Sequence, residues 1–191
     1  MGGLWAASEL PERSLADLGR IVPQNESWNA TRGEAYKSIN QGGTVLLYGG
    51  RTTGKTAMAV SIAIEIAADR PSPYPVPVKY VRALELLQDL RRKHNVNDAA
   101  SAELVKPSRR WPFLIIDELG VRARGDAEYS ESDAALITTL IDTRYQGMVG
   151  TMLISNEDRA QTFKILGPSI VRRIEQTGFT YSAKWPAFGG K

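Results

Sequence analysis

Short apolar runs alternate along this chain with longer stretches that have helical spacing. The first four short runs are rich in valine, leucine, isoleucine, methionine or phenylalanine, which is typical of buried strands. With one further candidate near the end, these runs cover residues 45–48, 78–81, 113–116, 151–155 and 179–182. We therefore expect five strands.

Helical spacing fills the intervals between these runs. Residues 57–68 are apolar nearly all round, as in a helix that is buried on several sides, and residues 83–90 have amphipathic spacing. Ser130 and Asp133 are spaced to cap a third helix, and Pro168 occupies a first-turn position of a short fourth one. This alternation predicts an α/β fold, in which a parallel sheet has helices on both faces.

The first forty residues lack strand signals. Residues 12–21 predict a short helix, and Thr31-x-x-Glu34 is interpreted as the capping box of a second helix that ends before Gly42. This part of the chain is therefore expected to lead into the core and to form no domain of its own.

At 191 residues the chain is long enough for one α/β core and too short for two full domains. We divide it into a short helical lead-in at residues 1–41, a core at residues 42–186 and a tail at residues 187–191. No apolar run approaches the roughly 18 residues of a membrane span, and the start does not read as a signal peptide. We expect a soluble, uncleaved protein that does not enter a membrane.

The sequence contains no cysteine, which excludes disulfides, thiolate zinc sites and thiol catalysis and fits a reducing cytoplasm. The 24 basic and 21 acidic residues nearly balance, so the overall charge does not demand a nucleic-acid partner. Local basic clusters occur at residues 91–94, 109–110, 122–124 and 172–173. Any one of them alone also fits a solvated helix end or loop.

A glycine-rich loop follows the first predicted strand and fits the pattern G-x-x-x-x-G-K-T in full. It consists of Gly49, Gly50, Arg51, Thr52, Thr53, Gly54, Lys55 and Thr56. In such a loop the backbone N–H groups face the α- and β-phosphates of a nucleotide. The lysine reaches the β- and γ-phosphate oxygens, and the final threonine ligates Mg²⁺. The leading ligand is therefore a nucleoside triphosphate with Mg²⁺.

Two carboxylates end the third predicted strand. Asp117 and Glu118 directly follow the apolar run, as the acids of a Walker B element do. This places Asp117 with Thr56 in the Mg²⁺ shell and assigns Glu118 to the orientation and deprotonation of the attacking water. A bare glycine-rich turn and a solvated carboxylate are the alternatives, but the two elements together favour a triphosphatase site.

Asn156 and Arg173 are further catalytic candidates. Asn156 comes at the tip of the fourth predicted strand, where its amide would polarise the γ-phosphate or the attacking water. An ordinary turn asparagine is the alternative. Arg172 and Arg173 lie on the last predicted helix, where an arginine finger would neutralise transition-state charge in a neighbouring subunit. By spacing alone, a basic surface pair explains these two arginines equally well.

In combination, these segments resemble the AAA+ ATPases of the DnaC-type helicase loaders and their IstB-type transposition relatives. The resemblance covers roughly residues 40–186 and includes a helix segment, Leu140-Ile141-Asp142-Thr143-Arg144-Tyr145, similar to the family's "lid-x-RY". The other similar segments are Walker A at 46–56, Walker B at 114–120, the sensor 1 strand at 152–156 and the "LGxxVxxRI" segment at 166–174.

The resemblance implies a P-loop AAA+ core with no or minimal lid domain, ATP and Mg²⁺ as cofactors, and Arg173 as an arginine finger in trans. It also implies a homo-oligomeric ring or filament that forms with ATP on single-stranded DNA and assists a replicative helicase or a transposase. Basic residues would then line the DNA path through phosphate contacts. The candidates are Arg91, Arg92, Lys93, Arg122 and Arg124.

The chain departs from the family pattern in three places. Loaders usually carry a separate region that grips the helicase, so any such contact is expected within residues 1–40. Lys184 stands where a sensor 2 arginine is common, and Arg51 replaces a small residue or proline in the loop.

Three other functions fit parts of the sequence. A GTPase switch is suggested by Asp117-x-x-Gly120, but the chain lacks the N-K-x-D that recognises guanine. A small-molecule kinase fits less well, because Glu118 suits the activation of water better than transfer to a bound acceptor. A nucleotide-gated scaffold with slow turnover is disfavoured by the intact Lys55, Thr56, Asp117 and Glu118.

Overall fold

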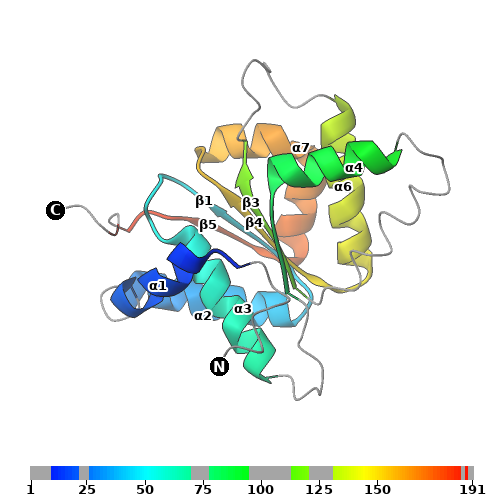
Figure 1. Cartoon of the computed structure of the whole chain (residues 1–191). Coiled ribbons are helices and arrows are strands. Elements are labelled where there is room, and N and C mark those ends of the chain that lie inside the picture. Colours follow the sequence, from blue (N-terminus) through cyan, green and yellow to red (C-terminus); the bar gives the residue numbers. More distant parts are fainter. Residues whose placement is uncertain are drawn as a thin grey trace.

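Five parallel strands form one sheet between two layers of helices in the computed structural model (Figure 1). It describes residues 10–21, 26–69, 78–94, 113–120, 131–185 and 188. The strands are β1 (Thr44–Tyr48), β2 (Val78–Arg82), β3 (Phe113–Leu119), β4 (Gly150–Ser155) and β5 (Phe179–Ser182). Their order across the sheet is β2-β3-β4-β1-β5. The predicted five-stranded parallel sheet is confirmed.

Helices cover both faces of the sheet, as predicted (Figure 1). One layer contains α1 (Glu12–Ile21), α2 (Glu26–Asn40) and α3 (Lys55–Asp69). The other contains α4 (Ala83–His94), α6 (Glu131–Gln146) and α7 (Arg159–Thr177). No helix in these described ranges is long and apolar enough to cross a membrane.

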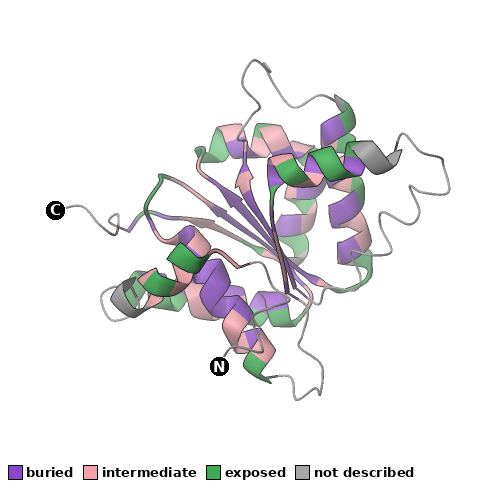
Figure 2. Ribbon diagram, viewed as in Figure 1, coloured by how far each residue is buried: buried purple, intermediate pink, exposed green. Residues whose placement is uncertain are grey.

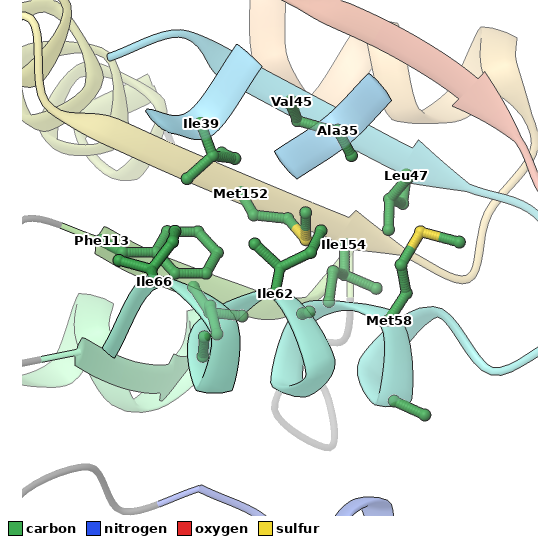
Figure 3. Packing of buried hydrophobic residues seen from close by; sticks show 14 of the residues in the cluster. Ala35, Ile39, Val45, Leu47, Met58, Ile62, Ile66, Phe113, Met152 and Ile154 are labelled. Carbon is green, nitrogen blue, oxygen red and sulfur yellow. The ribbon is translucent and has the colours of Figure 1, made fainter. Parts of the chain in front are cut away.

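Alternate residues of each central strand enter different halves of the core. Val45 and Leu47 of β1 pack with α2 and α3 (Figure 3). Leu46 packs on the other side of the sheet, with α6 and α7. Strand β3 divides in the same way, with Phe113 on the first side and Leu114 on the second. Because both faces are covered, the central strands β1, β3 and β4 read as nearly continuous apolar runs and are buried along most of their length (Figure 2).

Helix α2 begins five residues before the predicted capping box, at Glu26. Thr31 lies inside the helix and is buried, so the prediction that it caps the helix is wrong. Packing determines the start instead, because Trp28, Ala35 and Ile39 are all buried in the first half of the core. The division of the chain at residue 41 remains a prediction.

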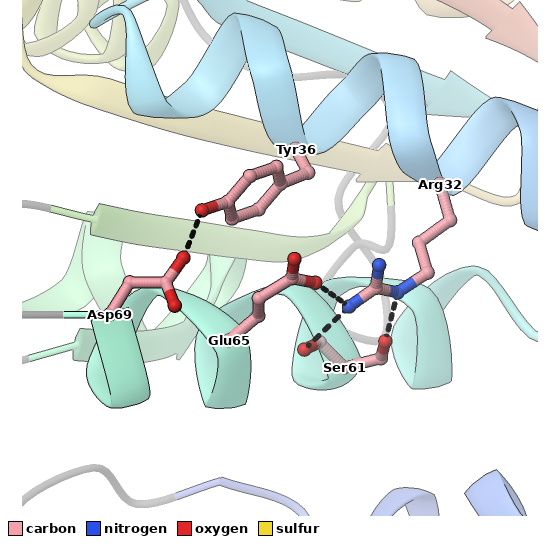
Figure 4. A network of polar contacts seen from close by, with 5 residues as sticks. All are labelled: Arg32, Tyr36, Ser61, Glu65 and Asp69. Carbon is pink, nitrogen blue, oxygen red and sulfur yellow. Dashed lines mark hydrogen bonds and ion pairs between the residues drawn. The ribbon is translucent and has the colours of Figure 1, made fainter.

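Helix α2 is also tied to α3 by polar contacts (Figure 4). Arg32 binds the Ser61 hydroxyl and the Glu65 carboxylate, and Tyr36 donates to the Asp69 carboxylate. The Arg32 guanidinium also donates to the Ser61 carbonyl oxygen at 3.3 Å. These contacts anchor the helix that begins with Lys55.

Helix α7 starts earlier than the sequence pattern suggested. Its N-cap is Asp158, whose side chain accepts a hydrogen bond from the Gln161 N–H at 2.8 Å. The helix breaks at Gly167, which has a φ of 75°, and Pro168 begins its second half. The prediction of a helix from Pro168 was therefore right for that half, but it missed the first half.

The same glycine-to-alanine substitution is expected to have opposite effects at two positions. A Cβ at Gly178 would overlap the Thr44 carbonyl oxygen of β1, so Gly178→Ala should lower the free energy of unfolding by about 1–3 kcal/mol. Gly33 lies within α2 with no atom within 4 Å of an added Cβ, so Gly33→Ala should raise it by about 0.5–1 kcal/mol. Urea unfolding measures both, and a stable Gly178→Ala protein would contradict the tight packing of α7 against β1.

Candidate nucleotide-binding site

The carboxyl ends of β1, β3 and β4 bring the predicted site segments to one edge of the sheet. Ser155 at the end of β4 pairs with Tyr48 of β1 on one side and with Leu119 of β3 on the other. The glycine-rich loop, the Walker B acids and Asn156 follow directly from these strand ends. Such an edge is where ligands bind in open α/β sheets.

The glycine-rich loop between β1 and α3 uses left-handed backbone conformations at three positions. The φ angles are 128° at Gly49, 61° at Thr52 and 77° at Gly54. Where residues of positive φ alternate with residues of negative φ, successive backbone N–H groups turn inward and form a concave anion site. Arg51 is exposed at the loop tip, and nothing in the structure explains why arginine stands there.

The Lys55 ammonium lies against the loop that precedes it. It donates to the carbonyl oxygens of Gly49 and Gly50 at 2.8 and 2.6 Å, and to Thr53 Oγ1 at 3.3 Å. The residue is 4% exposed. Lys55 thus lies inside the concave loop, and its binding to the β- and γ-phosphate oxygens of a nucleotide remains a prediction.

Burial lowers the pKa of Lys55 to about 8, although the nearby Asp117 carboxylate raises it in part. A phosphate binds the charged ammonium, so above pH 8 the free protein must take up a proton when ATP binds. Titration of Lys55 should therefore leave the affinity for ATP unchanged below pH 8. Above pH 8 it should lower that affinity by up to about tenfold per pH unit.

Calorimetry with a non-hydrolysable ATP analogue, in buffers of different ionisation enthalpy, measures this proton uptake. Lys37→Gln is a suitable control, because Lys37 is exposed on α2 and lies outside the proposed site. Binding at pH 9 without proton uptake would contradict the lowered pKa of Lys55.

Thr56 and Asp117 meet across the gap between α3 and β3. Thr56 Oγ1 donates to Asp117 Oδ2 at 2.7 Å, and Asp117 is 3% exposed. A hydroxyl and a carboxylate are hard oxygen ligands of the kind that Mg²⁺ prefers. The two residues that the sequence assigned to the metal are thus in contact and fit that ion.

Glu118 sits in a β-bulge. The register between β3 and β4 shifts between Ile116 and Leu119, and Glu118 has a φ of 57°, which is unusual for a residue other than glycine. Its carboxylate oxygen lies 3.6 Å from the Arg82 Nε at the end of β2. Both side chains are substantially exposed, so this pair holds Glu118 only weakly.

Two tryptophans that the sequence analysis missed hold the loop from opposite ends of the chain. The Trp28 indole of α2 donates to the Gly54 carbonyl oxygen at 3.2 Å, and the Trp185 indole donates to that of Thr53 at 2.6 Å. Only the tertiary structure brings them together, so no local sequence signal could have identified them. Lys184, the suggested substitute for a sensor 2 arginine, is exposed.

Asn156 lies in the turn directly after β4. Ser155, the residue before it, donates to the Leu119 carbonyl oxygen at 3.1 Å and accepts from the Thr162 hydroxyl at 3.0 Å. The first of these buried bonds joins the ends of β3 and β4, and the second joins β4 to α7. They place the Asn156 turn beside the Walker B acids, although its catalytic role remains a prediction.

Arg173 is engaged within its own chain. Its Nε and Nη2 lie 2.6 and 3.0 Å from the Asp142 carboxylate oxygens, and its guanidinium lies 5.1 Å from the centre of the Tyr145 ring. Arg172, its neighbour, is exposed. Asp142 and Tyr145 belong to the "lid-x-RY" segment, and Arg173 belongs to the "LGxxVxxRI" segment. These two family segments are therefore in contact in the structure.

One of the five DNA candidates, Arg91, has a described side chain. It forms a bidentate ion pair with the buried Asp133 of α6, through Nε at 2.8 Å and through Nη2. This ion pair joins α6 to α4. Ser130, which the sequence pairs with Asp133 as a helix cap, lies outside the described residues. The side chains of Arg92 and Lys93, and residues Arg122 and Arg124, also lie outside them.

Solved structures with the same fold include a helicase loader, a replication initiator and the protein DnaI. The DnaC helicase loader has a TM-score of 0.61 at 18% identity, over 95% of this chain and 99% of that one. DnaI has a TM-score of 0.65 at 19% identity, over 94% of each chain. DnaA, bound to AMPPCP and single-stranded DNA, has 0.66 at 19% identity, over 91% of this chain and 50% of its own.

Sequence comparison identifies the family. No curated protein sequence matches this chain significantly. The sequence profile of the IstB-like ATP-binding proteins matches residues 31–170, a range that includes the glycine-rich loop, both Walker B acids and Asn156 but ends before Arg173. Because the match spans well over half of the chain, this protein belongs to the IstB-like family of ATP-binding AAA+ proteins.

Proposed function

We propose that this protein is a DNA-acting ATPase, similar to a helicase loader, that hydrolyses ATP between its own subunits and assembles on single-stranded DNA. The observation that carries the proposal is the direct contact of Thr56 with Asp117 beside Lys55, next to a bulge that re-aims Glu118. This arrangement provides groups for phosphate, metal and water at one edge of the sheet. The likeness of fold to the DnaC helicase loader, over 95% of this chain, supports the loader role.

In the proposed reaction each residue has a separate task. Lys55 would bind the β- and γ-phosphate oxygens, and Thr56 and Asp117 would hold Mg²⁺, which would supply positive charge against the phosphates. Glu118 accepts a proton from the attacking water, while the Asn156 amide orients that water or the γ-phosphate. Arg173 of a neighbouring subunit adds a positive charge that stabilises the transition state.

A second candidate is an ATPase that assists a transposase. The family match favours it, because the profile is that of the IstB-like proteins. The two candidates share the same chemistry and differ in the DNA and the partner that the ATP-bound assembly would hold.

Binding to labelled single-stranded and duplex oligonucleotides, followed by fluorescence anisotropy, tests the proposal. With a non-hydrolysable ATP analogue, affinity for the single strand should exceed that with ADP by about 5- to 150-fold, the usual range of such coupling. A clear preference for duplex DNA would favour the transposition candidate. Affinity that does not depend on the nucleotide would contradict both.

The salt dependence of the same binding tests the proposed DNA residues. The Arg122→Ala, Arg124→Ala double variant should bind more weakly and lose about one unit of salt slope for each phosphate contact. Lys37→Ala is the control, since Lys37 is an exposed cation on α2 and is not among the proposed DNA residues. An unchanged slope in the double variant would remove these two arginines from the DNA path.

A further inference from the structure

The Walker B aspartate has a third polar partner that neither the motif nor the family resemblance identifies. Tyr80 lies on β2, and its hydroxyl donates to Asp117 Oδ2 at 3.0 Å. β2 pairs with β3 so that Val81 is opposite Ile116 and Arg82 is opposite Asp117. The phenol therefore reaches the carboxylate from the adjacent strand.

The three donors fix both oxygens of the Asp117 carboxylate. Oδ2 accepts from the hydroxyls of Thr56 and Tyr80, and Oδ1 accepts from the Glu118 N–H at 2.6 Å. Thr56 belongs to the glycine-rich loop and Glu118 to the Walker B segment. Tyr80 belongs to neither segment, so its hydroxyl can hold the Asp117 carboxylate while the Thr56 hydroxyl serves the metal.

A phenol is protonated at neutral pH, so Tyr80 acts as a hydrogen-bond donor to the Asp117 carboxylate. Its ring packs against the first half of the core, with Val78 on the same face of β2. Tyr80 is thus held in place by packing and is not a surface side chain that happens to reach the acid.

We propose that Tyr80 is a positioning residue for Mg²⁺ binding, because its hydroxyl fixes the orientation of the Asp117 carboxylate. This inference rests on the proposed function, in which Asp117 and Thr56 hold the metal. Hydrogen-bond partners of metal ligands orient those ligands, and their loss typically lowers metal affinity or activity by about 10- to 100-fold.

Tyr80→Phe tests the inference, since it removes one oxygen and keeps the ring. The affinity for a fluorescent ATP analogue would be measured over a series of Mg²⁺ concentrations. The Mg²⁺ concentration at the midpoint should rise about tenfold or more, while affinity in EDTA stays at the wild-type value. A purely structural role would instead change the melting temperature or weaken binding equally with and without Mg²⁺.

Two matched controls make the same substitution at other phenol–carboxylate pairs. Tyr36 donates to Asp69 between α2 and α3, and Tyr181 donates to Glu34. Neither carboxylate belongs to the proposed site. Tyr36→Phe and Tyr181→Phe should therefore leave the Mg²⁺ midpoint unchanged, whatever they do to the melting temperature.

Different failures of this experiment have different meanings. If wild-type affinity depends on Mg²⁺ and Asp117→Asn removes that dependence, but Tyr80→Phe shifts the midpoint no more than the controls, the role of Tyr80 is wrong. If Mg²⁺ does not affect wild-type binding, the assignment of the metal to Thr56 and Asp117 is itself wrong. A tenfold shift confined to Tyr80→Phe supports the inference.

Discussion

Replacement of Glu118 by glutamine is expected to lower the rate of ATP hydrolysis by about 10²- to 10⁴-fold, the usual contribution of a general base. The amide keeps the shape of the side chain but does not accept a proton from the attacking water. ATP binding should remain nearly unchanged, because Lys55, Thr56 and Asp117 are untouched. Single-turnover hydrolysis and equilibrium binding of ATP measure the two effects separately.

Glu157→Gln is the matched control for this variant. Glu157 is an exposed acid in the turn after β4, close to Gly120 at the end of Walker B. The Glu157→Gln protein should hydrolyse ATP at the wild-type rate. If Glu118→Gln also did so, Glu118 would not be the base, and a nucleotide-gated scaffold with slow turnover would become the better account.

The second large effect is expected at Arg173. An arginine finger accelerates hydrolysis by about 10³- to 10⁵-fold, so Arg173→Ala should nearly abolish turnover while ATP still binds. The fold should survive, because the Arg173–Asp142 pair is partly exposed and such pairs contribute about 0–1 kcal/mol. Steady-state hydrolysis and the melting temperature measure these outcomes.

Two variants separate a finger from a structural ion pair. Asp142→Ala breaks the same pair but keeps the guanidinium, so it should retain far more activity than Arg173→Ala. Arg172→Ala removes the exposed neighbour and should hydrolyse ATP normally. Equal losses in Arg173→Ala and Asp142→Ala would indicate a structural pair, and a larger loss in Arg172→Ala would transfer the finger to Arg172.

Most of the fold followed from periodicity, for a physical reason. The central strands are covered on both faces, so their apolar runs were unmistakable, and the loop and the Walker B acids lie at strand ends where the sequence itself locates them. The two errors concern helix starts. At Thr31 a local capping pattern was overruled by the burial of Trp28, and the N-cap at Asp158 was not recognised, so the first half of α7 was missed.

The contacts that complete the site were beyond prediction from sequence. Trp28, Tyr80 and Trp185 are far from the loop or the acids along the chain and reach them only after the strands have taken their order. The bulge at Glu118 depends on pairing with β4, which no local pattern specifies. The sequence thus provided the motif residues, whereas the sheet determined which other residues support them.

The central claim is that ATP bound at this site controls assembly on DNA. Mass measurement of the Glu118→Gln protein in solution, with and without ATP and a single-stranded oligonucleotide, tests it most directly. We predict a multi-subunit ring or filament when ATP and DNA are both present, and its loss when Lys55→Ala is added to the same chain. A monomer under every condition would contradict the claim.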